Sequence, residues 1–528
     1  MAGVVAAGHR KTAEAGQDIL QAGGNAFDAA VAAMLATCVA EPTLASLGGG
    51  GFLLAHQAET AKNTLFDFFT QTPGDRTEDH RPDFYPIKAD FGDSVQEFHI
   101  GLGSMAVPGM LAGVLAVHGR LGRLPLSVVA QPAVSYARKG IEVIPFQAYC
   151  YQLLDPILMA TAGARGIYAP EGHRLQAGEM IQMPLFADTL EYLAGLGDKE
   201  ALRAFYEGEI AQQVVRDCQA GGGYLSSEDF RRYRVIERSP LTIRYRGVQM
   251  ITNPPPSAGG SLIAFCLELL DRFDLSQMTF GSVEHLTLLS QAMRWTNEAR
   301  RSHLDDSLFD EAIAEKFITP DLVDRYAQPL EKLIARGVNR WGSTTHISVM
   351  DNEGNAASVT TSNGEGASYV IPGTQIMMNN MLGEEDLHPG GFHQWPVNQR
   401  MLSMMAPTML LESDKPQLVL GSGGSNRIRT AILQVISNIL DFGMPLSAAV
   451  EAPRIHWENG VFHLEPGLAA IRSSESISFE SGQWGTDRVL QWQQSNMFFG
   501  GVHTVGLNAS GLQGAGDPRR SGAIAQSK

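Results

Sequence analysis

The chain has 528 residues and a formal net charge of −16, and 18% of its residues are charged while 44% are hydrophobic. This balance is typical of a folded globular protein with a large core, and it excludes a disordered chain. The negative charge argues against nucleic acid and anionic membranes as partners. The chain does not open with a basic segment followed by a long apolar stretch, so we expect a cytoplasmic protein, or a periplasmic one if a signal was trimmed.

Two helices are expected near the start of the chain. Apolar residues at helical spacing predict the first over residues 12–20, and an alanine-rich run predicts the second over residues 26–40. Asn25 or Asp28 begins the second helix. Residues 74–98 are charged and contain prolines, so we expect a surface excursion there.

The next two hundred residues alternate helices with turn-rich joins. One pair of strands is expected at 241–245 and 248–251, joined by a turn at Arg246-Gly247. The four cysteines are widely spaced and form no CxxC pair, so the sequence predicts neither a zinc site nor a disulfide framework. Cys38 and Cys266 lie in apolar runs, which favours buried thiols. The expected helices are residues 126–139, 201–220, 260–270 and 282–301.

The second half of the chain is richer in strands. Strands are expected at 376–378, 408–411 and 418–420. A glycine-rich loop over 421–425 then leads into a helix that begins at Asn426 and ends at Gly443, so backbone N–H groups of the loop lie at a helix N-terminus, where the dipole favours an anion.

The chain is organised around residues 342–351, Gly-Ser-Thr-Thr-His-Ile-Ser-Val-Met-Asp. Apolar residues alternate with polar ones on both sides of the turn-rich run 351–355, which predicts a β-hairpin. A threonine at a chain N-terminus carries its own base, because its α-amino group titrates near pH ~8. Cleavage between Ser343 and Thr344 would make Thr344 such a nucleophile. Residues 317–343 are the expected connector, and the cleavable loop is expected at their end.

A set of motifs in order along nearly the whole chain resembles the γ-glutamyltransferase (γ-glutamyltranspeptidase) family. The run Thr344-Thr345-His346-x-Ser348-Val349-x-Asp351, followed by Gly354-Asn355-Ala356, is similar to the start of that family's small subunit. The other motifs are Ala22–Ala32, Leu47–Phe52, Val107–Gly109, Asn253–Gly260, Asn379-Asn380, Ser403–Thr408, Gly421–Ile428 and Gly514–Arg519.

The resemblance implies an α+β fold, the four-layer αββα sandwich of the N-terminal nucleophile hydrolases. It also implies a proenzyme that cuts itself into a large segment, 1–343, and a small segment, 344–528, which intertwine as one compact unit. The expected partners are these two subunits, as a heterodimer or a dimer of heterodimers, and a small-molecule amide with water or an amine as acceptor. Neither a metal nor an organic cofactor is expected.

The resemblance further implies an acyl transfer in two steps. Thr344 attacks an amide carbonyl, and water or a second amine then takes the acyl group from the enzyme. The backbone N–H groups of Gly424 and Ser425 match the family's oxyanion position, where the family has two glycines. Ser362 matches a second hydroxyl that supports the nucleophile, usually a threonine in the family.

The chain departs from the family where the carboxylate of a glutamyl group binds. Phe69 stands where the family has a carboxylate-binding arginine, and the family's paired serines become Ser403 and Met404. A phenylalanine supplies no donor to a carboxylate. We therefore expect a rebuilt, more apolar pocket that also includes Met381 and Met405.

On the side that binds the amino group of a glutamyl group, acidic and amide residues remain. The matching positions are Asn363 or Gly364, Met381 and Glu384, with Glu365 as a further candidate. The following segment, residues 385–402, is shorter than in relatives with a long lid, so we expect a more open site that admits larger acyl groups.

Three functions compete. The first is a γ-glutamyl hydrolase or transferase acting on glutathione-like amides, which the Thr344 motif favours. The second is an acylase of the same chemistry acting on a non-glutamyl amide, like the glutaryl- and cephalosporin-acylases, which Phe69 and Met404 favour. The third is a proenzyme-like scaffold without catalysis, whose mark would be a chain that stays uncut.

Overall fold

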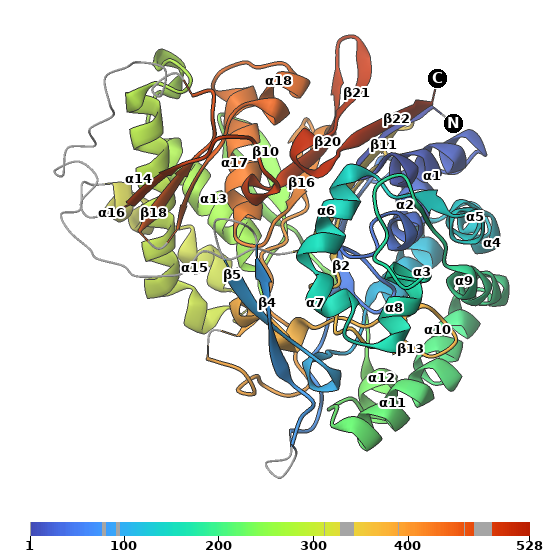
Figure 1. Cartoon of the computed structure of the whole chain (residues 1–528). Helices are drawn as coiled ribbons and strands as arrows, with labels where there is room; N and C mark the ends of the chain where they lie inside the picture. The colour runs from blue at the N-terminus through green and yellow to red at the C-terminus, as the bar shows by residue number, and fades with distance from the viewer. Residues whose placement is uncertain are drawn as a thin grey trace.

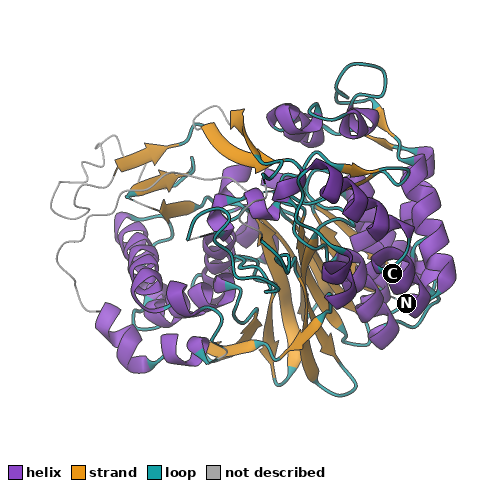
Figure 2. Ribbon diagram, turned by 90° about the horizontal axis from the view of Figure 1, so that it is seen from below, coloured by secondary structure: helices purple, strands orange, loops and turns teal. Residues whose placement is uncertain are grey.

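A computed structural model describes residues 2–76, 81–90, 95–310, 312–327, 343–388, 390–458, 460–468 and 488–527. Two antiparallel sheets lie face to face at its centre (Figures 1 and 2). The larger sheet has seven strands in the order β22-β1-β11-β12-β2-β3-β8, and the smaller has six in the order β21-β20-β16-β15-β10-β9. The strands of the larger sheet are β1 (Gly3–Ala7), β2 (Gly50–Gln57), β3 (Lys62–Phe68), β8 (Ile236–Arg238), β11 (Thr345–Asp351), β12 (Ala356–Ser362) and β22 (Ala523–Ser527). Those of the smaller sheet are β9 (Leu241–Tyr245), β10 (Val248–Thr252), β15 (Thr408–Glu412), β16 (Lys415–Gly423), β20 (Gly501–Asn508) and β21 (Gly511–Ala515).

Helices cover the outer face of each sheet, as Figure 2 shows. Those on the larger sheet include α1 (Arg10–Gln21), α2 (Ala26–Ala40) and α3 (Met110–Leu121), and those on the smaller sheet include α13 (Ala258–Leu270) and α17 (Arg427–Leu440), while α14 (Val283–His303) packs on α13. One apolar core lies between the larger sheet and its helices, and a second extends from between the sheets to α17. The predicted four-layer αββα sandwich is therefore confirmed.

Shorter elements complete the structure around these layers. The other helices are α4 (Leu126–Val129), α5 (Gln131–Lys139), α6 (Pro145–Leu153), α7 (Asp155–Leu158), α8 (Ala162–Tyr168), α9 (Pro184–Leu196), α10 (Asp198–Tyr206), α11 (Glu209–Gly221), α12 (Ser227–Arg232), α15 (Ile313–Phe317), α16 (Pro320–Ala327) and α18 (Leu446–Glu451). The other strands are β4 (Tyr85–Asp90), β5 (Val95–Ile100), β6 (Ile141–Glu142), β7 (Met180–Ile181), β13 (Val370–Ile371), β14 (Ile376–Met377), β17 (Ile455–Glu458), β18 (Val461–Leu464) and β19 (Arg488–Gln491).

Residues on both sides of the Ser343–Thr344 bond build both sheets. In the larger sheet, β1 pairs with β11 on one side and with β22 on the other, so the two chain termini lie side by side (Figure 1). In the smaller sheet, β10 pairs with β15. Because each sheet combines strands from segments 1–343 and 344–528, the two segments are intertwined, and both contribute to the two apolar cores.

The start of α2 shows how the second segment fixes a helix of the first. Asn25 is the N-cap residue, and its side chain accepts the N–H groups of Phe27 and Asp28 while the Asp28 carboxylate accepts the Asn25 N–H. This is a capping box, so Asn25 begins the helix and Asp28 supports it. Asp351, at the end of β11, accepts the Ala26 N–H at 2.9 Å. The negative side chains at this end also favour the helix dipole.

The segment expected as a surface excursion contains a hairpin, since β4 and β5 pair. One expectation from the sequence is corrected. Residues 421–423 are not a loop but the end of β16, because a bare backbone is needed there. A Cβ at Gly421 would lie 2.2 Å from the His346 ring, and one at Gly423 would lie 2.0 Å from the Thr344 carbonyl oxygen. The expected cleavable loop before Ser343 lies outside the described residues.

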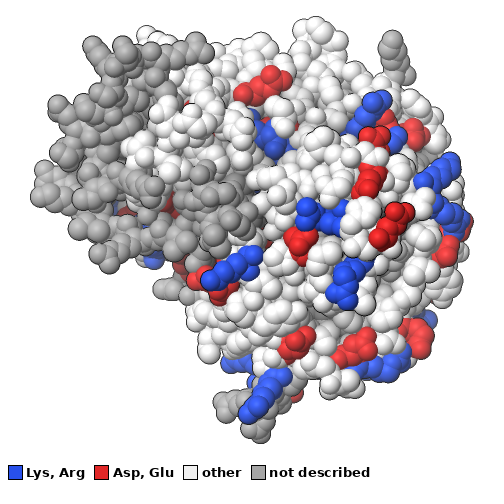
Figure 3. All heavy atoms as spheres, viewed as in Figure 1, with Lys and Arg blue, Asp and Glu red and all other residues white. Residues whose placement is uncertain are grey.

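The four cysteines are buried and free, as expected for Cys38 and Cys266. None of the described helices is both long enough and apolar enough to span a bilayer. On the face drawn in Figure 3, basic and acidic side chains lie next to one another.

Candidate active site

Thr344 directly precedes β11, at the end of a central strand of the larger sheet. The residue is 6% exposed, and its carbonyl oxygen accepts a hydrogen bond from Arg520 Nη1 at 3.1 Å. The same carbonyl lies against Gly423, at the end of β16 in the smaller sheet. Thr344 is therefore held where the ends of the two sheets meet.

The peptide bond before Thr344 is held by the turn that follows β12. Ser362 Oγ donates to the Ser343 carbonyl oxygen at 2.5 Å and accepts the Gly364 N–H at 3.0 Å. The Ser343 N–H donates to Glu365 Oε1 at 3.2 Å. A donor on this carbonyl polarises it toward nucleophilic attack. The structure thus brings Ser362 to the bond that the sequence predicts to be cut.

Gly424 and Ser425 connect β16 to α17, beside Thr344. Both have a left-handed backbone, with φ of 122° and 49°, a conformation that is uncommon for a serine. Within the described part of the chain, no acceptor receives their N–H groups. These two donors at a helix N-terminus suit a developing oxyanion. The Ser425 side chain donates to Asp386 Oδ2 at 2.9 Å, which links this turn to residues 385–387.

Three buried acceptor atoms near Ser343 receive no hydrogen bond from any described residue: Asn363 Oδ1, Glu365 Oε2 and Glu384 Oε1. Burial raises the pKa of Glu365 to about 8, and Asp386 adds to this effect. Burial, with the charges of Glu365 and Asp386, raises the pKa of Glu384 well above its ordinary value. Unpaired buried carboxylates cost free energy, and a cation among them would relieve that cost. The cluster can therefore hold an ammonium group.

Glu41, which sequence reasoning missed, lies beneath the nucleophile. It directly follows α2, and its carboxylate accepts the hydroxyls of Thr345 at 2.7 Å and Thr12 at 3.0 Å. Burial raises its pKa to about 7, although both hydroxyls and the Arg520 charge oppose the rise. In the sequence, Glu41 is an acidic residue directly after the alanine-rich run 26–40, and this position was the signal that could have revealed it. Glu41 positions the residue next to Thr344.

This buried carboxyl predicts a pH dependence of stability. The pKa of Glu41 is about 7 in the folded chain against an ordinary value of 4.5, so its folded form holds a proton that the unfolded form releases. Stability therefore falls as pH rises from about 4.5 to about 7, by roughly 3 kcal/mol for this group. In a Thr344→Ala chain, which stays uncut, Glu41→Gln should remove this part of the change with pH in the free energy of unfolding, as measured by urea unfolding at several pH values. If the free energy of unfolding changes equally with pH in both chains, Glu41 does not have the raised pKa.

The residues expected on the carboxylate side do not form one pocket wall. Phe69 is 1% exposed and stacks on Phe52 with ring centroids 5.5 Å apart. Met381 and Met405 belong to the same apolar cluster, whereas Met404 packs against a separate cluster around α13. Ser403 is buried, and its Oγ accepts the Met405 N–H at 3.0 Å.

Arg400 is a second residue that the sequence analysis missed. It is 5% exposed, and its Nη1 donates to the Phe69 carbonyl oxygen at 2.6 Å. Its guanidinium lies 3.1 Å from the Asp67 carboxylate and over the Tyr233 ring. A cation is thus present near position 69, but it is bonded to the protein itself.

A threonine held in this way, where two stacked antiparallel sheets meet and helices cover both outer faces, is the arrangement of an N-terminal nucleophile hydrolase. No group of three or more His, Cys, Asp or Glu among the residues described is placed to hold a metal ion. The position of Thr344 between the two sheets agrees with the class that the motifs imply.

Comparisons with known proteins narrow the class to a family. The family model described as Gamma-glutamyltranspeptidase matches residues 12–527. The glutathione hydrolase proenzyme of Escherichia coli (strain K12) is 32% identical over 494 residues, which cover 88% of this chain and 83% of that protein. The Acylase ACY 1 proenzyme of Pseudomonas sp. (strain V22) is 32% identical over 537 residues, which cover 98% of this chain and 92% of that protein. Among solved structures, the cephalosporin acylase from Bacillus halodurans matches with a TM-score of 0.83 and 25% identity over 99% of this chain and 95% of that one.

The chain belongs to the γ-glutamyltranspeptidase family. It is a γ-glutamyltransferase-like amidohydrolase of the N-terminal nucleophile type.

Proposed function

We propose that the chain matures by cutting itself between Ser343 and Thr344, and that it then transfers or hydrolyses the acyl group of γ-glutamyl-type amides. We further propose that it recognises the amino group of the acyl donor more strongly than the carboxylate. The observation that carries this proposal is the set of buried acceptors on Asn363, Glu365 and Glu384 that receive no hydrogen bond from any residue that the structure describes.

Maturation and turnover use the same hydroxyl. Thr344 Oγ attacks the Ser343 carbonyl carbon, the peptide C–N bond breaks, and an ester to Oγ forms while the Thr344 amine takes a proton. Water then hydrolyses the ester and leaves residues 1–343 and 344–528. The Ser362 hydroxyl, which donates to the Ser343 carbonyl oxygen at 2.5 Å, supports the first attack.

In turnover, Thr344 Oγ attacks the substrate amide and its α-amino group takes the hydroxyl proton. The same proton passes to the leaving amine when the C–N bond breaks, and water or an amine then opens the acyl ester. The N–H groups of Gly424 and Ser425 hold the oxyanion, an effect of roughly 3–4 kcal/mol per good donor.

The acidic cluster would receive the ammonium of the acyl group. Ser343 leaves the site on cleavage, so Glu365 Oε1 loses the N–H that it accepts in the uncut chain. Two oxygens of Glu365 and one of Glu384 then face a group that can donate three hydrogen bonds. An ammonium fits this need, and its charge offsets that of the carboxylates.

A series of three p-nitroanilides tests the preference. The γ-glutamyl anilide has both charged groups, the 4-aminobutanoyl anilide lacks the carboxylate, and the glutaryl anilide lacks the ammonium. Loss of the ammonium should lower kcat/KM by about 10- to 100-fold, the range of a hydrogen bond to a charged group. Loss of the carboxylate should change kcat/KM by less than about threefold, because Phe69 offers no donor and the neighbouring Arg400 is already bonded to the Phe69 carbonyl and Asp67.

Glu384→Gln should remove most of the difference between the 4-aminobutanoyl and glutaryl anilides. A glutaryl anilide turned over faster than the other two would instead favour the acylase alternative, for which the cephalosporin acylase structure and the acylase relative are the supporting comparisons.

A further inference from the structure

Ser425, the second residue of the turn between β16 and α17, has a backbone conformation that serine rarely adopts. Its φ of +49° lies in the left-handed region, which costs free energy for a residue with a Cβ. Such a conformation persists at a functional site only where the surrounding structure holds it in place. The groups that hold Ser425 therefore also fix the direction of the N–H groups that suit an oxyanion.

Two backbone contacts hold the ends of this turn beside the nucleophile. The Ile428 N–H, in the first turn of α17, donates to the Ser425 carbonyl oxygen at 3.0 Å. At the other end, Gly423 lies against Thr344, since a Cβ at Gly423 would be 2.0 Å from the Thr344 carbonyl oxygen. These contacts place the turn at the reacting centre, and a third contact holds the Ser425 side chain.

The third contact comes from Asp386. The Ser425 hydroxyl donates to Asp386 Oδ2 at 2.9 Å. A hydroxyl has a single proton to donate, and this bond uses it. With its carbonyl bonded to α17 and its side chain bonded to Asp386, Ser425 cannot rotate without breaking one of the two bonds. The N–H groups of the turn then keep one direction.

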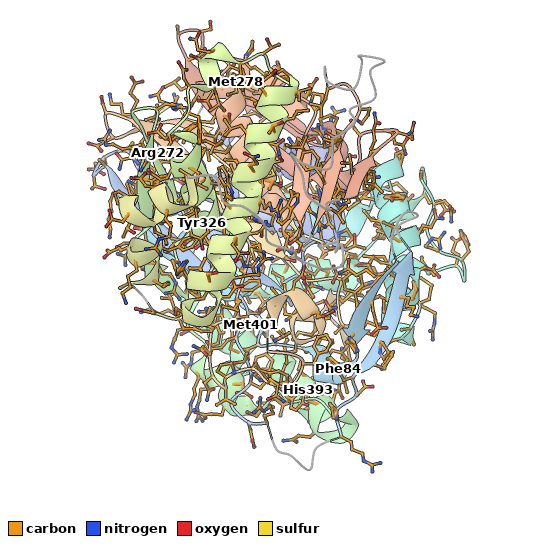
Figure 4. All side chains as sticks on the ribbon, turned by 90° about the vertical axis from the view of Figure 1, so that its left-hand side faces the viewer. Phe84, Arg272, Met278, Tyr326, His393 and Met401 are labelled. Carbon is orange, nitrogen blue, oxygen red and sulfur yellow. The ribbon has the colours of Figure 1, made fainter. Side chains whose placement is uncertain are left out.

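The segment that carries Asp386 is itself held by the protein. The His388 ring donates from Nε2 to the Met381 carbonyl oxygen at 3.0 Å. Further along the segment, His393 lies beside Phe84 (Figure 4), with ring centroids 4.5 Å apart. An acceptor on a fixed segment can hold its donor in one place, which is what a group that supports a reacting site requires.

Asp386 also lies close to the acidic cluster. Its charge contributes to the raised pKa of both Glu365 and Glu384. A substitution at Asp386 can therefore act through the oxyanion turn or through recognition of an ammonium group. Acyl groups with and without an ammonium separate the two effects.

We propose that Asp386 is a positioning residue for the reaction, and that its hydrogen bond holds Ser425 in the left-handed conformation that directs the N–H groups of the turn at the developing oxyanion. The inference rests on the proposed function, because an oxyanion forms only if Thr344 attacks an amide carbonyl. Asp386 supports the chemical step and not the choice of acyl group, so it affects kcat alike for every acyl group that the enzyme accepts.

The first experiment breaks the hydrogen bond from each side and measures kcat on fully cut enzyme with the 4-aminobutanoyl and glutaryl anilides. Asp386→Ala should lower kcat about tenfold on both, less than the loss of about 100- to 1,000-fold that follows removal of an oxyanion donor. Ser425→Ala removes the same bond and should cause a similar loss, and the double variant should lose no more than either single variant. A loss confined to the 4-aminobutanoyl anilide, or losses that multiply in the double variant, would overturn the proposal.

Glycine at position 425 tests whether Asp386 acts through the backbone of this residue. Glycine adopts a left-handed conformation without support, so adding Ser425→Gly to Asp386→Ala should restore most of the lost kcat, whereas adding Ser425→Ala should not. Glu385→Ala is the matched control, because it removes an exposed carboxylate from the neighbouring position and should leave kcat unchanged. No recovery with glycine, or an equal loss in Glu385→Ala, would overturn the proposal.

The wild-type enzyme tests the proposed function separately. If it turns over none of the anilides, the proposed function is overturned, and this inference with it. If it turns them over and Asp386→Ala does so with an unchanged kcat, only the role of Asp386 is overturned.

Discussion

Thr344→Ala is expected to yield a folded chain of 57.0 kDa that neither cleaves itself nor hydrolyses any of the anilides. The substitution removes one hydroxyl and one methyl group from a residue that the neighbouring strands hold through its backbone, so the fold should persist. The same hydroxyl serves maturation and turnover in the proposed mechanism. Loss of a nucleophile lowers kcat by about 10⁶-fold in a well-studied protease, and an effect of that order is expected here.

Intact mass after overnight incubation is the measurement. The wild-type chain should give two fragments, the second beginning at Thr344, while Thr344→Ala stays whole. Thr345→Ala is the matched control, because the Thr345 hydroxyl donates to Glu41 and not to the peptide bond to be cut. Cleavage in Thr344→Ala would show that another residue is the nucleophile. A wild-type chain that stays uncut would favour the scaffold function.

Gly364→Ala is expected to abolish recognition of the ammonium group. Gly364 has a φ of +60°, and a Cβ there would lie 2.2 Å from Asn380 Oδ1 and 2.3 Å from Glu384 Oε1. Either side chain must move, yet Asn380 Oδ1 accepts the N–H groups of Glu365 and Gly366 at 2.8 and 3.1 Å. The added methyl group therefore displaces the carboxylates that would hold the ammonium. We expect kcat/KM on the γ-glutamyl anilide to fall by about 100-fold or more.

The control separates this clash from backbone strain. Gly373 has a φ of +76°, and a Cβ there would meet no atom within 4 Å. An alanine at either position carries a left-handed strain of roughly 1–2 kcal/mol, but only Gly364→Ala adds the contact with Glu384. Gly373→Ala should lower the free energy of unfolding slightly and leave kcat/KM unchanged. Equal losses of activity in the two variants would show that strain alone explains the effect.

Local elements were predictable because their signals are local. The capping pair Asn25 and Asp28 marks the start of α2, and alternating residues predict the hairpins β9–β10 and β11–β12. Each of these patterns depends on residues a few positions apart, which contact one another whatever the rest of the chain does.

What packs against the polar face of β11 could not be predicted from neighbouring residues. All seven residues of this strand are buried, because the smaller sheet covers the face that alternation alone leaves polar. His346 bonds Thr360 and Ser348 there, and burial lowers its pKa well below the ordinary value. A period of two indicates that a strand has two faces, but it does not say what lies against each of them.

From the sequence alone, the motifs indicated the family, the αββα fold and Thr344 as the candidate nucleophile through their resemblance to known proteins, because that resemblance rests on residue types in order along the chain. Only the tertiary structure placed Glu41 and Arg520 beside Thr344, joined Arg400 to the backbone of Phe69, and buried carboxylate oxygens of Glu365 and Glu384 where no described residue donates to them. These contacts connect residues tens to hundreds of positions apart. They depend on how the sheets pair and stack, because burial and the distance between charges, and not residue type, decide what a carboxylate or a guanidinium can bind.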